Sequence, residues 1–267
     1  MSTRIDRRFA ALQANGEKGF IAYVTAGDPN LKATEDIVLR LGEVGVDIVE
    51  LGIPFSDPLA DGPVNQASAA RALEAGTTLE GVLGMVQRIR RHSDIPIMCY
   101  TYMNPIHARG AAGVLRDAAE AGVDGMLFLD LPVEESGPYV EWMRKYNVNN
   151  ITLVTPTTPP ARIARIVAKA SGFVYCVSRE GVTGAQKSLG SAALDLVART
   201  KELTPLPVAL GFGISSPEHA KAAARAADAV VVGSAIVNRF HEAPATAAGR
   251  LAAAAWVGRM VAAVKEA

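Results

Sequence analysis

The stretch VDIVELGIPFSDPLADGP (46–63) begins as an apolar run of strand type and continues as a polar loop with three prolines. In a strand, side chains alternate between two faces, so Ile48 and Glu50 share one face and Val49 and Leu51 share the other. Strands that are apolar on both faces are typical of parallel sheets that are covered on both sides. The stretch therefore predicts a buried parallel strand that carries a glutamate and leads into an acidic loop.

Similar apolar runs recur along the chain, and each is followed by a loop and a segment with helical periodicity. The eight candidate strands are FIAYVT (20–25), VDIVEL (46–51), IPIMCYT (95–101), DGMLFLD (124–130), NITLVT (150–155), GFVYCVS (172–178), LPVALG (206–211) and DAVVVG (228–233). We expect helices near 30–44, 78–91, 108–121, 133–146, 159–170, 189–202, 217–226, 234–241 and 245–265.

Strand and helix alternate without interruption, which is the pattern of an α/β protein with a parallel (β/α)8 TIM barrel. An amphipathic segment, MSTRIDRRFAALQANG (1–16), predicts an extra N-terminal helix, and 245–265 predicts a C-terminal one. An open doubly wound sheet is the alternative. No linker or change in composition divides the chain, so we expect residues 1–267 to form a single domain.

The composition argues against several classes of protein. The chain has 27 Lys and Arg and 27 Asp and Glu, so it has no strong field for nucleic acid or an anionic membrane surface. Cys99 and Cys176 lie in apolar runs, as expected for reduced core thiols of a cytoplasmic protein. No run of eighteen apolar residues occurs, and the four histidines share no metal-binding spacing. We therefore expect a small ligand or a protein partner.

In barrel enzymes the chemistry lies on the loops after the strand C-termini, which converge over one mouth. Glu50 is predicted to face the barrel axis at its strand's exit, where lost hydration favours the protonated form and prepares it for acid–base catalysis. The alternative is a glutamate paired with a buried base. Because Arg179 is the one basic residue at another predicted strand exit, catalysis is the favoured interpretation.

The loop after this strand contains Asp57 and Asp61 among Pro54, Pro58 and Pro63. The prolines make it stiff enough to hold a carboxylate over the mouth. Asp61 precedes a helical segment, so helix capping and catalysis remain equally open for it. Asp57 precedes a proline and is more typical of a turn.

Two glycine-containing loops, LGFGISS (210–216) and VGSAIV (232–237), follow the seventh and eighth strands, where barrels commonly bind phosphate. Exposed backbone amides and a helix starting at Ser234 would suit an anion, although glycine also occurs in such turns for steric reasons. The segment SREGVTGAQ (178–186) has the composition of a lid. Tyr175 either directs its hydroxyl to the mouth or fills the core.

Six segments of this sequence resemble the tryptophan synthase alpha subunit family. They are YVTAGDP (23–29), VELGIPFSDPLADGPVNQAS (49–68), DLPVEES (130–136), SREGVTGA (178–185), GFGISSPE (211–218) and GSAIV (233–237). They span nearly the whole chain in the family's order, and the acidic loop and GVTGA are the most specific of them. The resemblance implies a lyase of tryptophan biosynthesis that cleaves indole-3-glycerol phosphate to indole and glyceraldehyde 3-phosphate.

The resemblance also implies individual roles. Glu50 matches the glutamate that moves protons between indole C3 and the glycerol hydroxyl, and Asp61 matches the aspartate that holds the indole N–H and stabilises the cation. Tyr175 matches the tyrosine beside the glutamate, and Thr183 the lid threonine that contacts the aspartate. The remaining matches are a phosphate site of Gly184, Gly213, Gly233 and Ser234 and an indole slot of Tyr23, Tyr102, Leu127, Leu129, Val177 and Phe212.

Two positions depart from the family pattern, with Tyr23 in place of phenylalanine and Val177 in place of leucine. The resemblance implies no metal or cofactor in this chain. It further implies a beta subunit that carries pyridoxal phosphate and receives indole in an α2β2 assembly, docked on Pro54–Pro58 and Asn104–Arg109. Competing interpretations are a sugar-phosphate isomerase, an indoleglycerol-phosphate synthase, for which no catalytic lysine is found at a strand exit, and a non-catalytic activating subunit.

Overall fold

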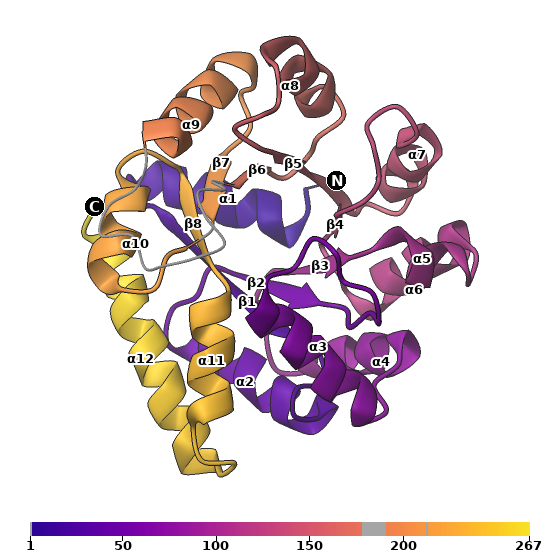
Figure 1. The fold of residues 1–267 in the computed structure, drawn as a ribbon, viewed down its shortest axis with the longest axis vertical. Helices are drawn as coiled ribbons and strands as arrows, with labels where there is room; N and C mark the ends of the chain where they lie inside the picture. Colours follow the sequence, from indigo (N-terminus) through magenta and orange to yellow (C-terminus); the bar gives the residue numbers. More distant parts are fainter. Residues whose placement is uncertain (1, 178–190, 212) are drawn as a thin grey trace.

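The computed structural model describes residues 2–177, 191–211 and 213–267. Its strands form a closed parallel barrel in the order β1-β2-β3-β4-β5-β6-β7-β8, with the helices arranged around them (Figure 1). The strands are β1 Gly19–Thr25, β2 Ile48–Gly52, β3 Ile97–Thr101, β4 Gly125–Phe128, β5 Asn149–Val154, β6 Val174–Val177, β7 Val208–Gly211 and β8 Ala229–Val232. All eight predicted strands are confirmed, and the open doubly wound sheet is wrong.

Twelve helices lie in the described part of the chain. They are α1 Arg4–Asn15, α2 Leu31–Glu43, α3 Pro63–Glu74, α4 Leu79–Ile89, α5 Met103–His107, α6 Ala111–Ala121, α7 Gly137–Lys145, α8 Pro160–Val167, α9 Ser191–Leu203, α10 Pro217–Ala224, α11 Ser234–Glu242 and α12 Ala247–Lys265. The sequence did not predict α5, because five residues are too few to show helical periodicity. Its first amide, Met103 N, donates to Asp130 Oδ1 at 2.7 Å.

Strand alternation separates two apolar cores. One lies inside the barrel and includes Ile48, Met98 and Leu127. The other lies between strands and helices and includes Val49 and Leu51. This is the orientation that the alternation in VDIVEL predicts, and it places Glu50 on the inner face of β2 with Ile48.

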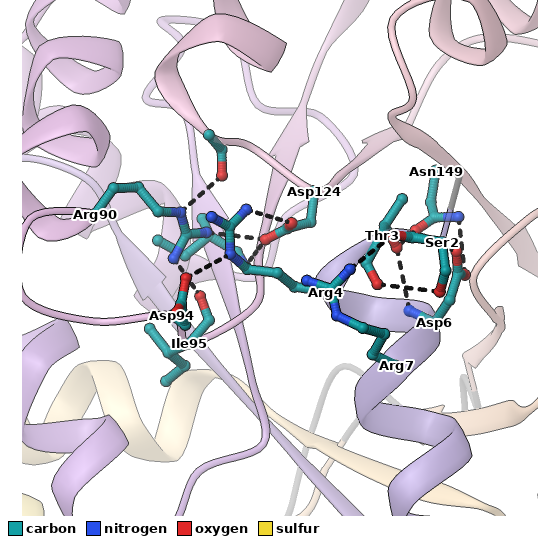
Figure 2. A network of polar contacts seen from close by, with 12 residues as sticks. Ser2, Thr3, Arg4, Asp6, Arg7, Arg90, Asp94, Ile95, Asp124 and Asn149 are labelled. Atoms are coloured by element: carbon teal, nitrogen blue, oxygen red, sulfur yellow. Dashed lines mark hydrogen bonds and ion pairs between the residues drawn. The ribbon is translucent and has the colours of Figure 1, made fainter.

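Helix α1 closes the end of the barrel where the strands begin. Its buried residues Ile5, Phe9 and Leu12 belong to the interior core. A polar network holds its first turn, as Figure 2 shows: Arg4 pairs with the buried Asp124 at 3.2 Å, and Arg90 pairs with the same carboxylate at 2.9 Å. With this end closed, the mouth at the strand C-termini is the face left for a ligand.

Helix α12 is the one helix among the described residues that is long and apolar enough to cross a membrane, with a mean hydropathy of 1.2 over its most apolar window. It packs against α10 and α2, and its buried side chains include Val257, Met260 and Val264. The buried face of α12 is therefore part of the protein core. Cys99 and Cys176 are free and buried, as the sequence predicted.

Candidate active site

Glu50 lies in the middle of β2 with its side chain inside the barrel, and only 1% of its surface is exposed. In register it stands between Tyr23 of β1 and Met98 of β3. Its Oε1 atom has no hydrogen-bond partner among the described residues. The pKa of this carboxyl is raised to about 8, first by burial and second by the nearby charge of Asp61. Among the described residues no ion pair involves Glu50, so the alternative of a buried base is wrong.

Asp61 is held over the mouth by two phenols. Tyr100 Oη donates to Asp61 Oδ1 and Tyr102 Oη donates to Oδ2, each at 2.8 Å. The N-cap of α3 is Gly62, which makes no side-chain capping bond, so Asp61 does not cap that helix. Burial raises the pKa of Asp61, while hydrogen bonds from Tyr100, Tyr102 and Asn65 act in the opposite direction. Of the two roles left open by the sequence, the capping role is wrong.

Two tyrosines occupy space left by glycines on the next strand. A Cβ atom added at Gly52 would lie within 3 Å of the Tyr23 ring and hydroxyl, and one added at Gly211 would do the same to Tyr175. Both tyrosines are buried, and Tyr175 belongs to the core inside the barrel. Glycine at these positions therefore leaves room for each phenol against the neighbouring strand. Tyr175 faces the interior of the barrel, as does Phe173 two residues before it.

The Tyr23 hydroxyl begins a buried chain of hydroxyl groups. It lies 3.3 Å from Thr25 Oγ1, which lies 2.6 Å from Ser68 Oγ on α3. The Ser68 hydroxyl donates to the carbonyl of Asn65 at 2.9 Å. This chain ties the inner face of β1 to the helix that follows the Asp61 loop.

The remaining residues of the predicted indole slot differ in their surroundings. Leu127 is buried inside the barrel, whereas Leu129 and Val177 are half-buried against the same core. Tyr102 is 5% exposed, its ring lies 5.3 Å from that of Phe55, and its hydroxyl is engaged with Asp61. Tyr102 therefore contacts the aspartate in addition to lining the mouth, which the sequence did not predict.

Tyr100 is the residue that the sequence prediction missed. It shares the inner face of β3 with Met98, and its ring meets that of Tyr23 edge-on at 5.3 Å between centroids. The signal was available in the alternation of 98, 100 and 102, which places both tyrosines on the side of Glu50. Their contact with Asp61 was not predictable, because about forty residues separate the partners.

The predicted phosphate ligands follow β7 and β8, two neighbouring strands of the barrel. Gly213 is exposed and has a left-handed φ of 73°. Gly233 is the N-cap of α11, and Ser234 is its first residue. The start of this nine-residue helix carries main-chain amides suited to an anion. Thr183, Gly184, Phe212 and Arg179, with the predicted lid, lie outside the described residues.

Two other predictions concern side chains near the mouth. Asp57 is exposed and accepts a hydrogen bond from Ser56 Oγ at 2.5 Å, as suits a turn residue. Within residues 2–177, 191–211 and 213–267, no group of three or more His, Cys, Asp or Glu side chains is placed to hold a metal ion. The described mouth brings together two carboxyls, Glu50 and Asp61, and four phenols, Tyr23, Tyr100, Tyr102 and Tyr175.

Comparison with known proteins shows which family this chain belongs to. A family model described as the tryptophan synthase alpha chain matches residues 9–265. The chain is 48% identical to the tryptophan synthase alpha chain of Citrifermentans bemidjiense, over 90% of both chains. It is 47% identical to that of Opitutus terrae, over 98% of this chain and 99% of the relative. The structure of tryptophan synthase subunit alpha from Legionella pneumophila covers all of both chains at 36% identity, with a TM-score of 0.89.

Proposed function

The chain belongs to the tryptophan synthase alpha chain family, and from this we infer that it is a lyase that cleaves indole-3-glycerol phosphate to indole and glyceraldehyde 3-phosphate. The observation that carries the inference to individual residues is the buried Glu50 beside Asp61 inside the barrel. The competing isomerase, synthase and non-catalytic interpretations do not account for this pair together with the family match.

We propose that Glu50 carries a proton from one end of the breaking bond to the other. With a pKa of about 8, Glu50 is mostly protonated at neutral pH and can donate to indole C3. The resulting carboxylate then accepts the proton of the glycerol hydroxyl next to the bond. As the aldehyde C=O forms, the C–C bond breaks and its electron pair returns to the indole ring. Glu50 ends in its starting protonation state.

In this mechanism Asp61 stabilises the positive charge that develops on the ring when C3 is protonated. The hydrogen bond from the indole N–H to this carboxylate would be stronger in the cationic intermediate than in the bound substrate. Only an interaction that strengthens in this way lowers the reaction barrier. The two phenol donors that hold Asp61 at 2.8 Å support this role, because hydrogen bonds to the ionised form oppose the effect of burial.

We propose that the substrate's phosphate binds at Gly213, Gly233 and Ser234, with Gly184 as a further amide donor. The support is the start of α11 and its position beyond β8, next to the loop after β7. The indole ring would lie among Tyr23, Tyr102, Leu127, Leu129, Tyr175, Val177 and Phe212, with Thr183 contacting Asp61 when substrate is bound. Because Tyr23 carries a hydroxyl where the family pattern has phenylalanine, this slot would be more polar than one that contains phenylalanine.

We also propose a beta subunit as partner, in an α2β2 assembly located in the cytoplasm, with pyridoxal phosphate in the partner and no cofactor in this chain. The docking face would comprise Pro54–Pro58 and Asn104–Arg109. The two segments adjoin, since Phe55 packs on Tyr102 just before α5. Next to them Leu59 is 92% exposed, which is typical of an apolar contact residue at an interface.

Leu59→Ser tests this docking face. We expect it to weaken capture of a purified beta subunit, while Leu251→Ser, at a 52% exposed leucine on α12, leaves capture unchanged. Isothermal titration of the beta subunit with each variant measures the effect. Equal affinities for the two variants would contradict the proposed face.

The reaction itself is tested by incubating the purified chain with indole-3-glycerol phosphate, with and without a beta subunit, and quantifying indole and glyceraldehyde 3-phosphate. We expect both products in equal amounts. Release of neither product under both conditions would refute the proposed activity.

A further inference from the structure

We propose that Tyr100 is a positioning residue for the reaction, which together with Tyr102 fixes the Asp61 carboxylate in place by holding both of its oxygens. This inference rests on the proposed function. It assigns a role to a residue on the inner face of β3 that the motifs of the sequence do not mark.

The two phenols bind different oxygens of one carboxylate. Tyr100 reaches Oδ1 from within β3, and Tyr102 reaches Oδ2 from the residue just after the strand. A carboxylate held at both oxygens cannot rotate about its terminal torsion without losing a bond, whereas one held at a single oxygen can. The pair therefore sets the direction in which Asp61 faces the mouth.

Tyr100 is itself held firmly. Its ring stands edge-on to Tyr23, 5.3 Å away and inclined by 78°. Across the strand pair it lies opposite Gly52, whose missing side chain leaves room for the Tyr23 ring. The position of the Tyr100 hydroxyl therefore depends on packing between three neighbouring strands.

Tyr102 has a second contact that Tyr100 lacks. Its hydroxyl oxygen accepts a hydrogen bond from the Ala60 backbone N–H at 3.0 Å, and its O–H donates to Asp61. Tyr102 thus also fixes the backbone of the loop, and its removal would disturb more than the carboxylate. Among the described residues, Asp61 is the one hydrogen-bond partner of the Tyr100 hydroxyl, so Tyr100→Phe is the cleaner probe.

The charges around Asp61 explain why such donors matter. Glu50 on β2 faces it from inside the barrel, and Tyr23 and Tyr175 face it from β1 and β6. None of these groups is a cation, and burial adds to the preference for the neutral acid. Burial and the charge of Asp61 also raise the pKa of Tyr100, so it stays a proton donor. The phenols therefore provide the stabilisation that a nearby base would otherwise give.

The first test compares wild type, Tyr100→Phe and Tyr146→Phe in the indole-release assay from pH 5 to pH 9. Tyr100→Phe keeps the ring and removes one hydrogen-bond donor to Asp61. We therefore expect kcat to fall roughly tenfold, and the acidic limb of the kcat–pH profile to move up by about one pH unit. KM should change less than kcat, because the lost hydrogen bond acts through Asp61, which stabilises the cation formed during the reaction more than it stabilises the bound substrate. Tyr146 is the C-cap of α7, packs against the core between strands and helices, and serves as the phenol control.

A second test is independent of catalysis. In protein labelled with ¹³C at the aspartate carboxyls, NMR titration follows Asp61, whose resonance is identified by its loss in Asp61→Asn. We expect its pKa to rise by about one unit in Tyr100→Phe and to stay unchanged in Tyr146→Phe. Unaltered binding of glycerol 3-phosphate and an unaltered circular dichroism spectrum confirm that the variant is folded.

The outcomes separate the two proposals. If wild type releases no indole, the proposed function fails, and the NMR titration still decides the role of Tyr100. If wild type is active while Tyr100→Phe keeps both the wild-type pH profile and the wild-type pKa of Asp61, the positioning role is refuted. Should Tyr100→Phe not fold, Tyr102→Phe is titrated in its place, and an unshifted Asp61 there refutes the paired action.

Discussion

Replacing Glu50 by glutamine should make the folded protein less sensitive to alkaline pH. The folded state raises the pKa of Glu50 from 4.5 to about 8, so it binds this proton more tightly than the unfolded chain does. The free energy of unfolding therefore falls as the pH rises from the lower value to the higher. At 1.36 kcal/mol per pK unit, the loss from Glu50 between pH 5 and pH 8 is about 3 kcal/mol.

Glutamine keeps the shape of the side chain and removes this ionisation. The free-energy cost of burying the glutamine amide inside the barrel is the same at every pH, so this cost cancels when two pH values are compared. We therefore expect the stability of Glu50→Gln relative to wild type to increase by about 3 kcal/mol from pH 5 to pH 8.

Urea unfolding of both proteins at half-unit pH steps, followed by circular dichroism, measures this difference. Groups that do not interact with Glu50 contribute equally to wild type and variant, and Asp61, whose charge acts on Glu50, is the main exception. Glu141→Gln, at an exposed glutamate on α7, is the matched control and should show no such trend. A Glu50→Gln difference that stays flat across this range would refute the claim that burial holds Glu50 in its neutral form.

Three further changes test other parts of the account. Asp61→Asn should lower the rate of indole release at least a hundredfold, because a neutral amide cannot stabilise the ring cation, with phosphate-ligand affinity as the control measurement. Gly211→Ala should displace the Tyr175 ring, cost about 1–3 kcal/mol in urea unfolding and raise KM for the substrate. Arg90→Met should leave the buried Asp124 with one partner fewer, lowering the urea unfolding free energy by about 3 kcal/mol while kcat at low temperature stays unchanged.

Much of the barrel was predictable because its rules are local. Each strand is a short run that is apolar on both faces, and the period of two predicts the inward direction of Glu50 that the structure shows. The predicted fourth strand extended past its observed end at Phe128, because Leu129 continues the apolar run after the barrel pairing has stopped. The assignment of residues 1–267 to a single domain stays a prediction.

The site was less predictable because its contacts join distant parts of the chain. The local rule left helix capping as open as catalysis for Asp61, whereas in the structure Gly62 is the N-cap and Asp61 is bonded to Tyr100 and Tyr102. Gly52 and Gly211 leave room for the phenol rings of Tyr23 and Tyr175 on neighbouring strands, and the local sequence around each glycine does not indicate this contact. Helix α5 was too short to leave a periodic signal, although it starts directly after Tyr102.

The central claim is that Glu50 moves the proton between indole C3 and the glycerol hydroxyl. Single-turnover release of indole by wild type and Glu50→Gln, with substrate occupancy matched by a prior binding titration, tests it most directly. We expect the variant to bind indole-3-glycerol phosphate with nearly wild-type affinity and to release no indole above the buffer control. Release by Glu50→Gln at the wild-type rate would contradict it.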